Sequence, residues 1–315
     1  MPSELGPVVT STPLERDDRT GARLGVVILN WNGRHHLLAC LQSLVNCRPE
    51  SDLIVVVDNG SVDGSAEAVE ASFPEVVVIR NEQNLGFAQA NNMGSRVAVE
   101  RGCDWILVLN NDTIVDREAL GFLMSATAAP NVGVINPLIV DMDNRIWFSG
   151  GTFKRWAGSI SHSHDPVDRD GGLLDITTAT GCAMLVAART VLELGPFDER
   201  YFIYFEDSDL SATLRRRGKR IVLQPAAVVR HKISADSLQN APTGFFYYLN
   251  TRNRLLFTRH HLPTLVWLIF LARFTFGYVI PRSVALLVLG RVSKARAMIR
   301  GYLDFFRGRF GPPPL

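Results

Sequence analysis

Apolar runs that alternate with helix-like segments constrain the fold of this chain more than any other feature. Four runs are almost continuously apolar, as strands buried on both faces of a sheet are: residues 24–30, 53–57, 76–79 and 105–109. Segments with helical spacing of apolar or small side chains lie between and after them: residues 34–47, 65–72, 87–101 and 116–126, the last with an acidic first turn. This alternation predicts an α/β fold with a mostly parallel central sheet and helices on both faces.

Asparagine and aspartate dominate the loops that follow these runs. Polar groups buried at the carboxyl end of a strand cost free energy unless they bind something, and in open α/β sheets ligands bind at that edge. Turn chemistry explains a single loop, where Asp63 or Ser65 can cap a helix, but four successive polar loops indicate a ligand site. Its candidate residues are Asn30, Asn32, Asp58, Asn84, Asn110, Asn111 and Asp112.

These loops match neither of the common glycine-rich phosphate-binding patterns. The sequences G-x-G-x-x-G and G-x-x-x-x-G-K-[ST] do not occur in them, which disfavours a dinucleotide site and a P-loop. A divalent cation is then the obvious way to neutralise a ligand's phosphates, and Asp112 offers the hard oxygen that Mg²⁺ or Mn²⁺ prefers. His231 ends a later strand-like run and could complete a metal shell, although a single histidine is more often structural.

A segment rich in aromatic and acidic residues, 197–210, is the candidate for proton transfer. It contains Glu206, Asp207 and Asp209 among tyrosine and phenylalanine side chains. A carboxyl held against aromatic rings has its charged form disfavoured, which raises its pKa and suits it to general-base chemistry. The same acids also fit the acidic first turn of a helix that ends near residues 217–218. Both interpretations stand at this point.

The last 75 residues carry a strong positive charge. Residues 241–315 contain ten Arg, one Lys and one acid, a net charge of +10, whereas the whole chain carries +2 and the remainder therefore −8. The apolar stretch 263–290 is interrupted by Arg273, Pro281 and Arg282, and its runs 262–272 and 284–290 are too short to span a bilayer. The pattern predicts amphipathic helices lying on an anionic membrane surface.

Two other interpretations of this basic tail remain open. It could form an ordinary helical subdomain packed on the core, or a kinked re-entrant hairpin. Nucleic acid is the less suitable partner because the long apolar stretches fit lipid better than a phosphate backbone.

Three segments are expected along the chain. Residues 1–22 lack the apolar core of a signal peptide and read as a disordered leader. Residues 23–240 form the catalytic domain, in which short strands and polar loops after residue 132 supply the second half of the site, and residues 241–315 form the basic helical tail. The four cysteines form no C-x-x-C pair, which fits a reducing compartment.

Taken in order, the motifs resemble those of family 2 glycosyltransferases, and most closely the bacterial rhamnosyltransferase branch. The likeness covers roughly residues 24–256. It rests on Asn-Trp-Asn-Gly from residue 30, Asp-Asn-Gly-Ser from 58, Asn-Leu-Gly-Phe from 84, Leu-Asn-Asn-Asp-Thr from 109, Thr-Gly-Cys-Ala from 180, Phe-Glu-Asp from 205 and Arg-His from 230. The resemblance implies the GT-A nucleotide-diphospho-sugar transferase fold.

The resemblance also implies a role for each candidate residue. Asp207 would be the general base, and Asp112 with His231 would hold a divalent cation, Mg²⁺ or Mn²⁺. Because Asn110 stands at the first position of the family's D-x-D motif, either the metal would bind weakly or the donor's own diphosphate would mainly support its binding. Donor-binding residues would be Asn30, Asn32, Asp58, Asn84, Asn110, Asn111 and Asp112, and acceptor-binding residues Thr180, Gly181, Glu206 and Arg252.

The implied activity is inverting transfer of a sugar from a nucleotide diphosphate donor. The expected donor is dTDP-rhamnose and the expected acceptor a glycan or a polyprenyl-diphosphate-linked glycan of the cell surface, at the cytoplasmic face of the membrane. A UDP-sugar-dependent transferase and a catalytically lapsed membrane-peripheral binding module are the alternatives. A nucleotidyltransferase is disfavoured, because residues 30–33 lack the cation of that class's signature loop.

Overall fold

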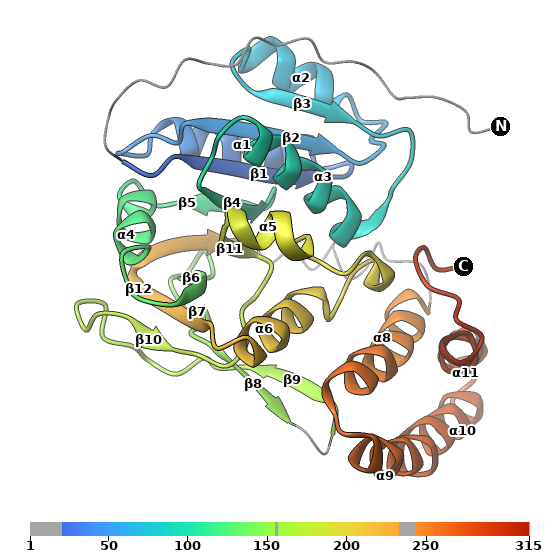
Figure 1. Cartoon of the computed structure of the whole chain (residues 1–315). Helices are drawn as coiled ribbons and strands as arrows, with labels where there is room; N and C mark the ends of the chain where they lie inside the picture. The colour runs from blue at the N-terminus through green and yellow to red at the C-terminus, as the bar shows by residue number, and fades with distance from the viewer. Residues whose placement is uncertain (1–20, 155–156, 233–243, 315) are drawn as a thin grey trace, which may run out of the picture.

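The computed structural model describes residues 21–154, 157–232 and 244–314. Its centre is a ten-stranded mixed sheet in the order β10-β12-β6-β11-β4-β1-β2-β3, with β5 paired to β12 and β7 to β6, and β8 and β9 form a separate hairpin (Figure 1). The strands are β1 (Leu24–Asn30), β2 (Leu53–Asp58), β3 (Val77–Arg80), β4 (Trp105–Asn110), β5 (Thr113–Val115), β6 (Val132–Val140), β7 (Ile146–Phe148), β8 (Gly151–Lys154), β9 (Ser159–His162), β10 (Leu174–Asp175), β11 (Ala183–Ala187) and β12 (Arg220–His231).

The four predicted apolar runs form the parallel half of this sheet. β1 lies between β2 and β4 and is parallel to both, and β3 extends the sheet beyond β2. The chain thus moves outward from β1 to β3 and returns to the other side of β1 for β4, so the strand order reverses there. Such a reversal is the usual ligand site of an open α/β sheet. The predicted architecture, a mostly parallel central sheet with helices on both faces, is confirmed.

Helices cover both faces of the sheet and bury two apolar cores. Because side chains alternate along a strand, Val26 and Ile28 of β1 face the core beneath α1, whereas Val27 faces the core beneath α3. The helices of this part are α1 (Arg34–Val45), α2 (Ser65–Ser72), α3 (Gly86–Glu100), α4 (Ala119–Ala126), α5 (Ala188–Leu194), η1 (Glu199–Tyr201) and α6 (Glu206–Arg216). The prediction for residues 116–126 was wrong at its start, because α4 begins at Ala119 and has no acid in its first turn.

The C-terminal region forms a helical layer beside the sheet (Figure 1). It consists of α8 (Phe245–His261), α9 (Thr264–Phe274), the π-helix η2 (Thr275–Val279), α10 (Ile280–Val288) and α11 (Val292–Phe306). The prediction of separate short apolar runs was wrong, because α9, η2 and α10 join into one 25-residue helix that is long and apolar enough to cross a membrane by length and composition. The expected leader, except residues 21 and 22, and the expected boundary at residue 240 lie outside the described residues.

Candidate active site

The polar loops after β1, β2 and β4 meet where the strand order reverses. Asn30 is fully buried; its amide nitrogen donates to Asp58 Oδ1 and to Ser61 Oγ, both at 3.2 Å. The amide of Asn111 donates in turn to Asn30 Oδ1 at 2.6 Å. The Asp58 carboxylate, 5% exposed, also accepts the backbone N–H of Ser61 at 3.3 Å. This network brings four residues from three neighbouring loops into one polar floor.

The loops after β2 and β3 are joined by a second amide network. The side-chain amide of Asn59 donates to Asn84 Oδ1 at 2.9 Å, and Asn59 Oδ1 accepts from the Asn81 side chain and from the backbone N–H of Leu85. Asn84 Oδ1 also accepts the N–H of Gly86, which begins α3. Sequence reasoning missed Asn59, although its position directly after Asp58 was a signal. On the other side of the floor, Asn32 accepts the N–H of Val62 at 2.8 Å.

Asp112 and His231 are brought together by strand pairing. β5 follows Asp112 directly and pairs antiparallel with the end of β12, with Thr113 opposite His231. His231 Nε2 lies 3.2 Å from Asp112 Oδ2. Asp112 Oδ1 and His231 Nδ1 are both buried and meet no hydrogen-bond partner among the described residues. A hard carboxylate oxygen that has no partner beside an imidazole fits a divalent cation, so these residues fit the predicted metal role.

Trp147 and His162 form a wall that sequence reasoning missed. The Trp147 ring packs edge-on against the His231 ring at 4.8 Å and against the His162 ring at 5.1 Å between centroids. Burial lowers the pKa of His162, and the nearby charge of Asp207 opposes that shift. His162 ends β9, a short strand in the region after residue 132 whose individual strands were not predicted. Its alternation from Ser159 to His162 was the available signal for a strand.

Asp207 lies in the first turn of α6 against the turn before β11. The N–H of Gly181 donates to Asp207 Oδ2 at 3.0 Å, and the N–H of Ser208 donates to Oδ1 at 2.6 Å. The next residue along the turn, Cys182, accepts the backbone N–H of Asn110 at 2.9 Å. The Thr180–Gly181 turn therefore connects Asp207 to the end of β4, and through it to Asp112. The structure brings these predicted residues to one edge of the sheet.

The aromatic residues before Asp207 are in strained backbone conformations. Phe202, Tyr204 and Phe205 all have positive φ, at 66°, 72° and 76°. Bulky side chains rarely adopt this region, and such strain persists only where the surroundings enforce it. The raised carboxyl pKa expected in this segment falls on Glu206, mainly through burial and then through the charge of Asp207.

Arg252 and Asn253 of α8 hold the strained segment in place. Asn253 Nδ2 lies 2.9 Å from the backbone oxygens of Tyr201, Ile203 and Tyr204. The guanidinium of Arg252 is fully buried and donates to the backbone oxygens of Tyr201 at 3.1 Å and Gly311 at 2.8 Å. The expectation that Arg252 contacts the acceptor is corrected here, because its donors are turned to backbone carbonyls inside the protein.

Replacing Asn253 by Leu is expected to lower the free energy of unfolding by about 2–4 kcal/mol. Leucine keeps the volume but removes the donor, and each buried carbonyl left without one costs about 1–3 kcal/mol. Urea denaturation followed by tryptophan fluorescence measures the change. Gln83→Leu, at an exposed amide, is the matched control. Equal stability of Asn253→Leu and wild type would contradict the clamp role.

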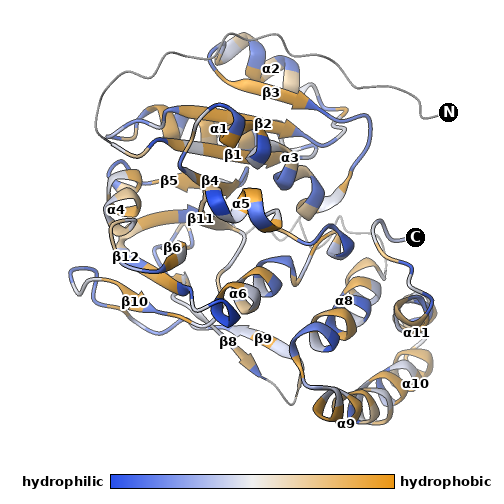
Figure 2. Cartoon of the chain, in the orientation of Figure 1, coloured by the Kyte–Doolittle hydropathy of each residue, from blue (hydrophilic) through white to orange (hydrophobic). Residues whose placement is uncertain are grey.

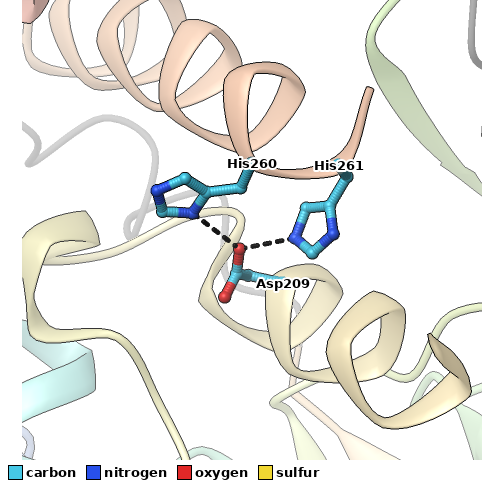
Figure 3. A group of neighbouring side chains, drawn as sticks. All are labelled: Asp209, His260 and His261. Carbon is cyan, nitrogen blue, oxygen red and sulfur yellow. Dashed lines mark hydrogen bonds and ion pairs between the residues drawn. The ribbon is translucent and has the colours of Figure 1, made fainter. Parts of the chain in front are cut away.

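Asp209 connects α6 to the end of α8, away from the sheet edge that carries Asp58 and Asp112. Its Oδ1 accepts from Tyr201 Oη at 2.9 Å and from His261 Nε2 at 2.7 Å, with His260 Nδ1 at 3.5 Å (Figure 3). Burial alone would raise the pKa of Asp209, but the hydrogen bonds from both histidines and the tyrosine outweigh it and hold the pKa below its usual range. One carboxylate oxygen of Asp209 and one ring nitrogen each of His260 and His261 lie close enough together to hold a metal ion. The Asp209 carboxylate, however, already accepts from three donors. The group therefore works as a junction between helices.

The Asp209 junction predicts a pH-dependent contribution to stability. Asp209→Asn is expected to lower the free energy of unfolding by about 1.5–3 kcal/mol at pH 7, as for hydrogen bonds to a charged group. Because the pKa of Asp209 is lower in the folded chain than its ordinary value of 3.8, this contribution is present above that value and declines as the pH falls below it. Urea denaturation at pH 7 and near 3.5 measures it, with exposed Asp170→Asn as control. A difference that does not shrink at the lower pH would contradict the account.

Comparisons with known proteins agree with this arrangement. The model of the family described as glycosyltransferase like family 2 matches residues 22–258. The chain is 28% identical over 236 residues to the N-acetylglucosaminyl-diphospho-decaprenol L-rhamnosyltransferase of Mycobacterium tuberculosis, covering 66% of this chain and 75% of that protein. It is 23% identical over 248 residues to the dTDP-rhamnosyl transferase RfbF of Shigella flexneri, covering 76% and 81% of the two chains.

The fold is shared with solved glycosyltransferases. The mannosyltransferase PcManGT from Pyrobaculum calidifontis, solved with GDP-Man and Mn²⁺, superposes with a TM-score of 0.56 at 14% identity over 92% of this chain and 89% of that one. The family match covers three-quarters of the chain and includes every predicted site residue. The chain therefore belongs to the glycosyltransferase like family 2, and it is a glycosyltransferase with the GT-A fold.

Proposed function

We propose that this enzyme transfers rhamnose from dTDP-rhamnose, with inversion, to a polyprenyl-diphosphate-linked glycan. The observation that carries the proposal is the shared edge of the sheet, where Asp58, Asp112 with His231, and Asp207 are linked through the turn at Gly181. The sugar is supported by two relatives that are named as rhamnosyltransferases, and one of these names includes a diphospho-decaprenol acceptor.

The proposed mechanism is a single displacement. Asp207 takes the proton from an acceptor hydroxyl, the oxygen forms a bond to the anomeric carbon, and the bond from that carbon to the nucleoside diphosphate breaks. Attack from the face opposite the leaving group inverts the configuration. The hydrogen bonds from Gly181 and Ser208 hold the carboxylate still before the acceptor arrives.

The donor is proposed to lie across the polar floor. Asp58, with Asn30, Asn32, Asn84, Asn110 and Asn111 around it, accepts hydrogen bonds from the nucleoside. Asp112 and His231 would hold Mg²⁺ or Mn²⁺, and the bound cation would supply positive charge to the diphosphate leaving group. Trp147 packs on His231 and so keeps the imidazole in place. Thr180, Gly181 and Glu206 line the acceptor side.

We further propose that the tail, residues 241–315, docks the enzyme on the inner face of the cell membrane. Large apolar side chains that are exposed concentrate there: among the described residues, fourteen of twenty-two lie after Pro263. Figure 2 shows the apolar character of α9 and α10 at the outside of the molecule. Patches of this kind on a protein mark contact with lipid or a partner, and the net charge of +10 on residues 241–315 favours anionic lipid.

A thermal-shift panel tests the donor. The protein is heated with dTDP, UDP or GDP, each with Mn²⁺, with Mg²⁺, or with a chelator. A ligand at a hundred times its dissociation constant adds about 2.7 kcal/mol, so dTDP with a divalent cation is expected to raise Tm by several degrees, and by more than UDP or GDP. A larger shift with UDP would favour the UDP-sugar alternative, and no shift with any nucleotide would contradict the proposal.

A further inference from the structure

A cavity of about 750 Å³ lies between the β8–β9 hairpin and the C-terminal helices. It is separate from the polar floor at the carboxyl ends of the strands. Its lining includes Ser159 of β9, Arg254 of α8 and Arg273 of α9, together with the rings of Phe274 and Tyr278. Guanidinium groups and aromatic rings thus face the same space.

The charges around this cavity are unbalanced. Two arginines line it, and no carboxylate occurs among its described lining residues. The Arg254 guanidinium lies 5.5 Å from the Phe274 ring centroid and 5.2 Å from that of Tyr278, and one of its nitrogens donates to Asn250 at 3.0 Å. Its Nε is buried without a hydrogen-bond partner among the described residues. A desolvated cation with spare donors is suited to an anion with several oxygens, such as a phosphate.

The β8–β9 hairpin connects the cavity to the part of the site that contains Asp207. Ser159 lines the cavity, and His162, three residues further along β9, lies close enough to Asp207 to feel its charge. Three residues of a strand span about 10 Å. The hairpin is fixed against the helices: a Cβ at Gly158 would lie 2.6 Å from the Phe270 ring, and Phe153 packs on Phe257 at 5.0 Å.

One wall of the cavity belongs to the 25-residue apolar helix that α9, η2 and α10 form together. The π-helix η2 supplies Phe276, Gly277 and Tyr278 to the lining, and Phe276 is 72% exposed. π-helical turns inside α-helices occur frequently at functional sites. An anion held by Arg254 and Arg273 would thus lie directly beside a surface suited to a hydrocarbon chain.

We infer that this cavity binds the diphosphate head of the lipid-linked acceptor, between Arg254 and Arg273. The polyprenyl chain leaves along the exposed side of α9, η2 and α10, and the sugars attached to the diphosphate extend along β9 toward Asp207. This inference rests on the proposed function, and it assigns the acceptor's diphosphate to a place that the donor-binding residues do not touch.

Vesicle flotation tests the inference with the full chain. The probe is a phosphatidylcholine vesicle containing decaprenyl diphosphate, compared with plain vesicles and with phosphatidylglycerol vesicles of equal surface charge. Arg273→Gln, at an exposed position, and Arg254→Gln are each expected to weaken binding to the decaprenyl diphosphate vesicles at least tenfold. Arg282→Gln removes the same charge from the same helix outside the cavity and is expected to bind like wild type.

Three outcomes would overturn the inference. Equal losses in Arg273→Gln and Arg282→Gln would assign binding to the general charge of the tail. If wild type binds phosphatidylglycerol vesicles as tightly as decaprenyl diphosphate vesicles, the cavity has no specificity for a diphosphate. If wild type binds free inorganic diphosphate as tightly as it binds decaprenyl diphosphate vesicles, the cavity belongs to a soluble phosphate compound. The thermal shift with dTDP reports the proposed function separately, and the cavity variants are expected to leave it unchanged.

Discussion

Replacing Asp207 by Asn is expected to lower sugar transfer by about a thousandfold while nucleotide binding stays near the wild-type level. General-base catalysis contributes about 10²–10⁴ in rate, and an amide of the same shape cannot take the proton from the acceptor hydroxyl. The amide oxygen can still accept the N–H of Gly181 or Ser208, which hold the carboxylate in wild type, so the fold is expected to survive. Single-turnover transfer and the dTDP thermal shift together measure the two effects.

Companion variants sharpen the assignment of the base. Glu206 is buried with a raised pKa and follows the strained aromatic segment, so Glu206→Gln is the nearest competitor. Asp209 is engaged by Tyr201 and His261, and Asp209→Asn is expected to affect stability more than the rate of the chemical step. Near-normal turnover in Asp207→Asn would move the base to Glu206.

Replacing Asp112 by Asn is expected to lower transfer by about a hundredfold to a thousandfold. Removing one group that stabilises charge developing on a leaving group costs about 3–4 kcal/mol. Loss of the carboxylate also weakens binding of the cation. Mn²⁺ should therefore raise the affinity for dTDP much less than it does in wild type. Calorimetric titration with dTDP, with and without Mn²⁺, measures this directly.

The control for Asp112 is Asp143→Asn, which removes an exposed carboxylate from the turn between β6 and β7. It is expected to behave like wild type in both titrations. If Asp112→Asn keeps the full Mn²⁺ dependence, then the cation is held by groups other than the Asp112 carboxylate.

Local sequence patterns predicted the parallel half of the sheet and its polar edge. The apolar runs became β1 to β4, and Asn30, Asp58 and Asn111 meet in one hydrogen-bonded network. This part was predictable because parallel strands place their carboxyl ends at a common edge whatever the details of the turns. The roles of these residues in binding a donor stay predictions.

Contacts between distant segments could not be predicted in the same way. Trp147 and His162 join the site only because β7 and the β8–β9 hairpin fold back beside β12 and α6. β5 is only three residues long, so it carries too little periodicity to be recognised in the sequence. Its pairing with β12 is nevertheless what places Asp112 beside His231.

Two further differences have local physical causes. Pro281 suggested a break between apolar runs, but the π-helical turn η2 directly before α10 lets the helix pass the missing N–H of that proline. The family resemblance implied that Arg252 binds the acceptor. Its partners include the backbone carbonyls of Arg200 and Tyr201, directly before the strained segment, and such strain is not visible in a sequence.

Transfer to a defined acceptor, with the configuration of the product determined, tests the central claim most directly. The enzyme is incubated with dTDP-rhamnose, Mn²⁺ and N-acetylglucosaminyl-diphospho-decaprenol, and the product is analysed by mass spectrometry and NMR. We predict one deoxyhexose added for each dTDP released, an anomeric configuration opposite to that of the donor, and loss of the product in Asp207→Asn. A product with retained configuration, or one formed equally well by Asp207→Asn, would contradict the account.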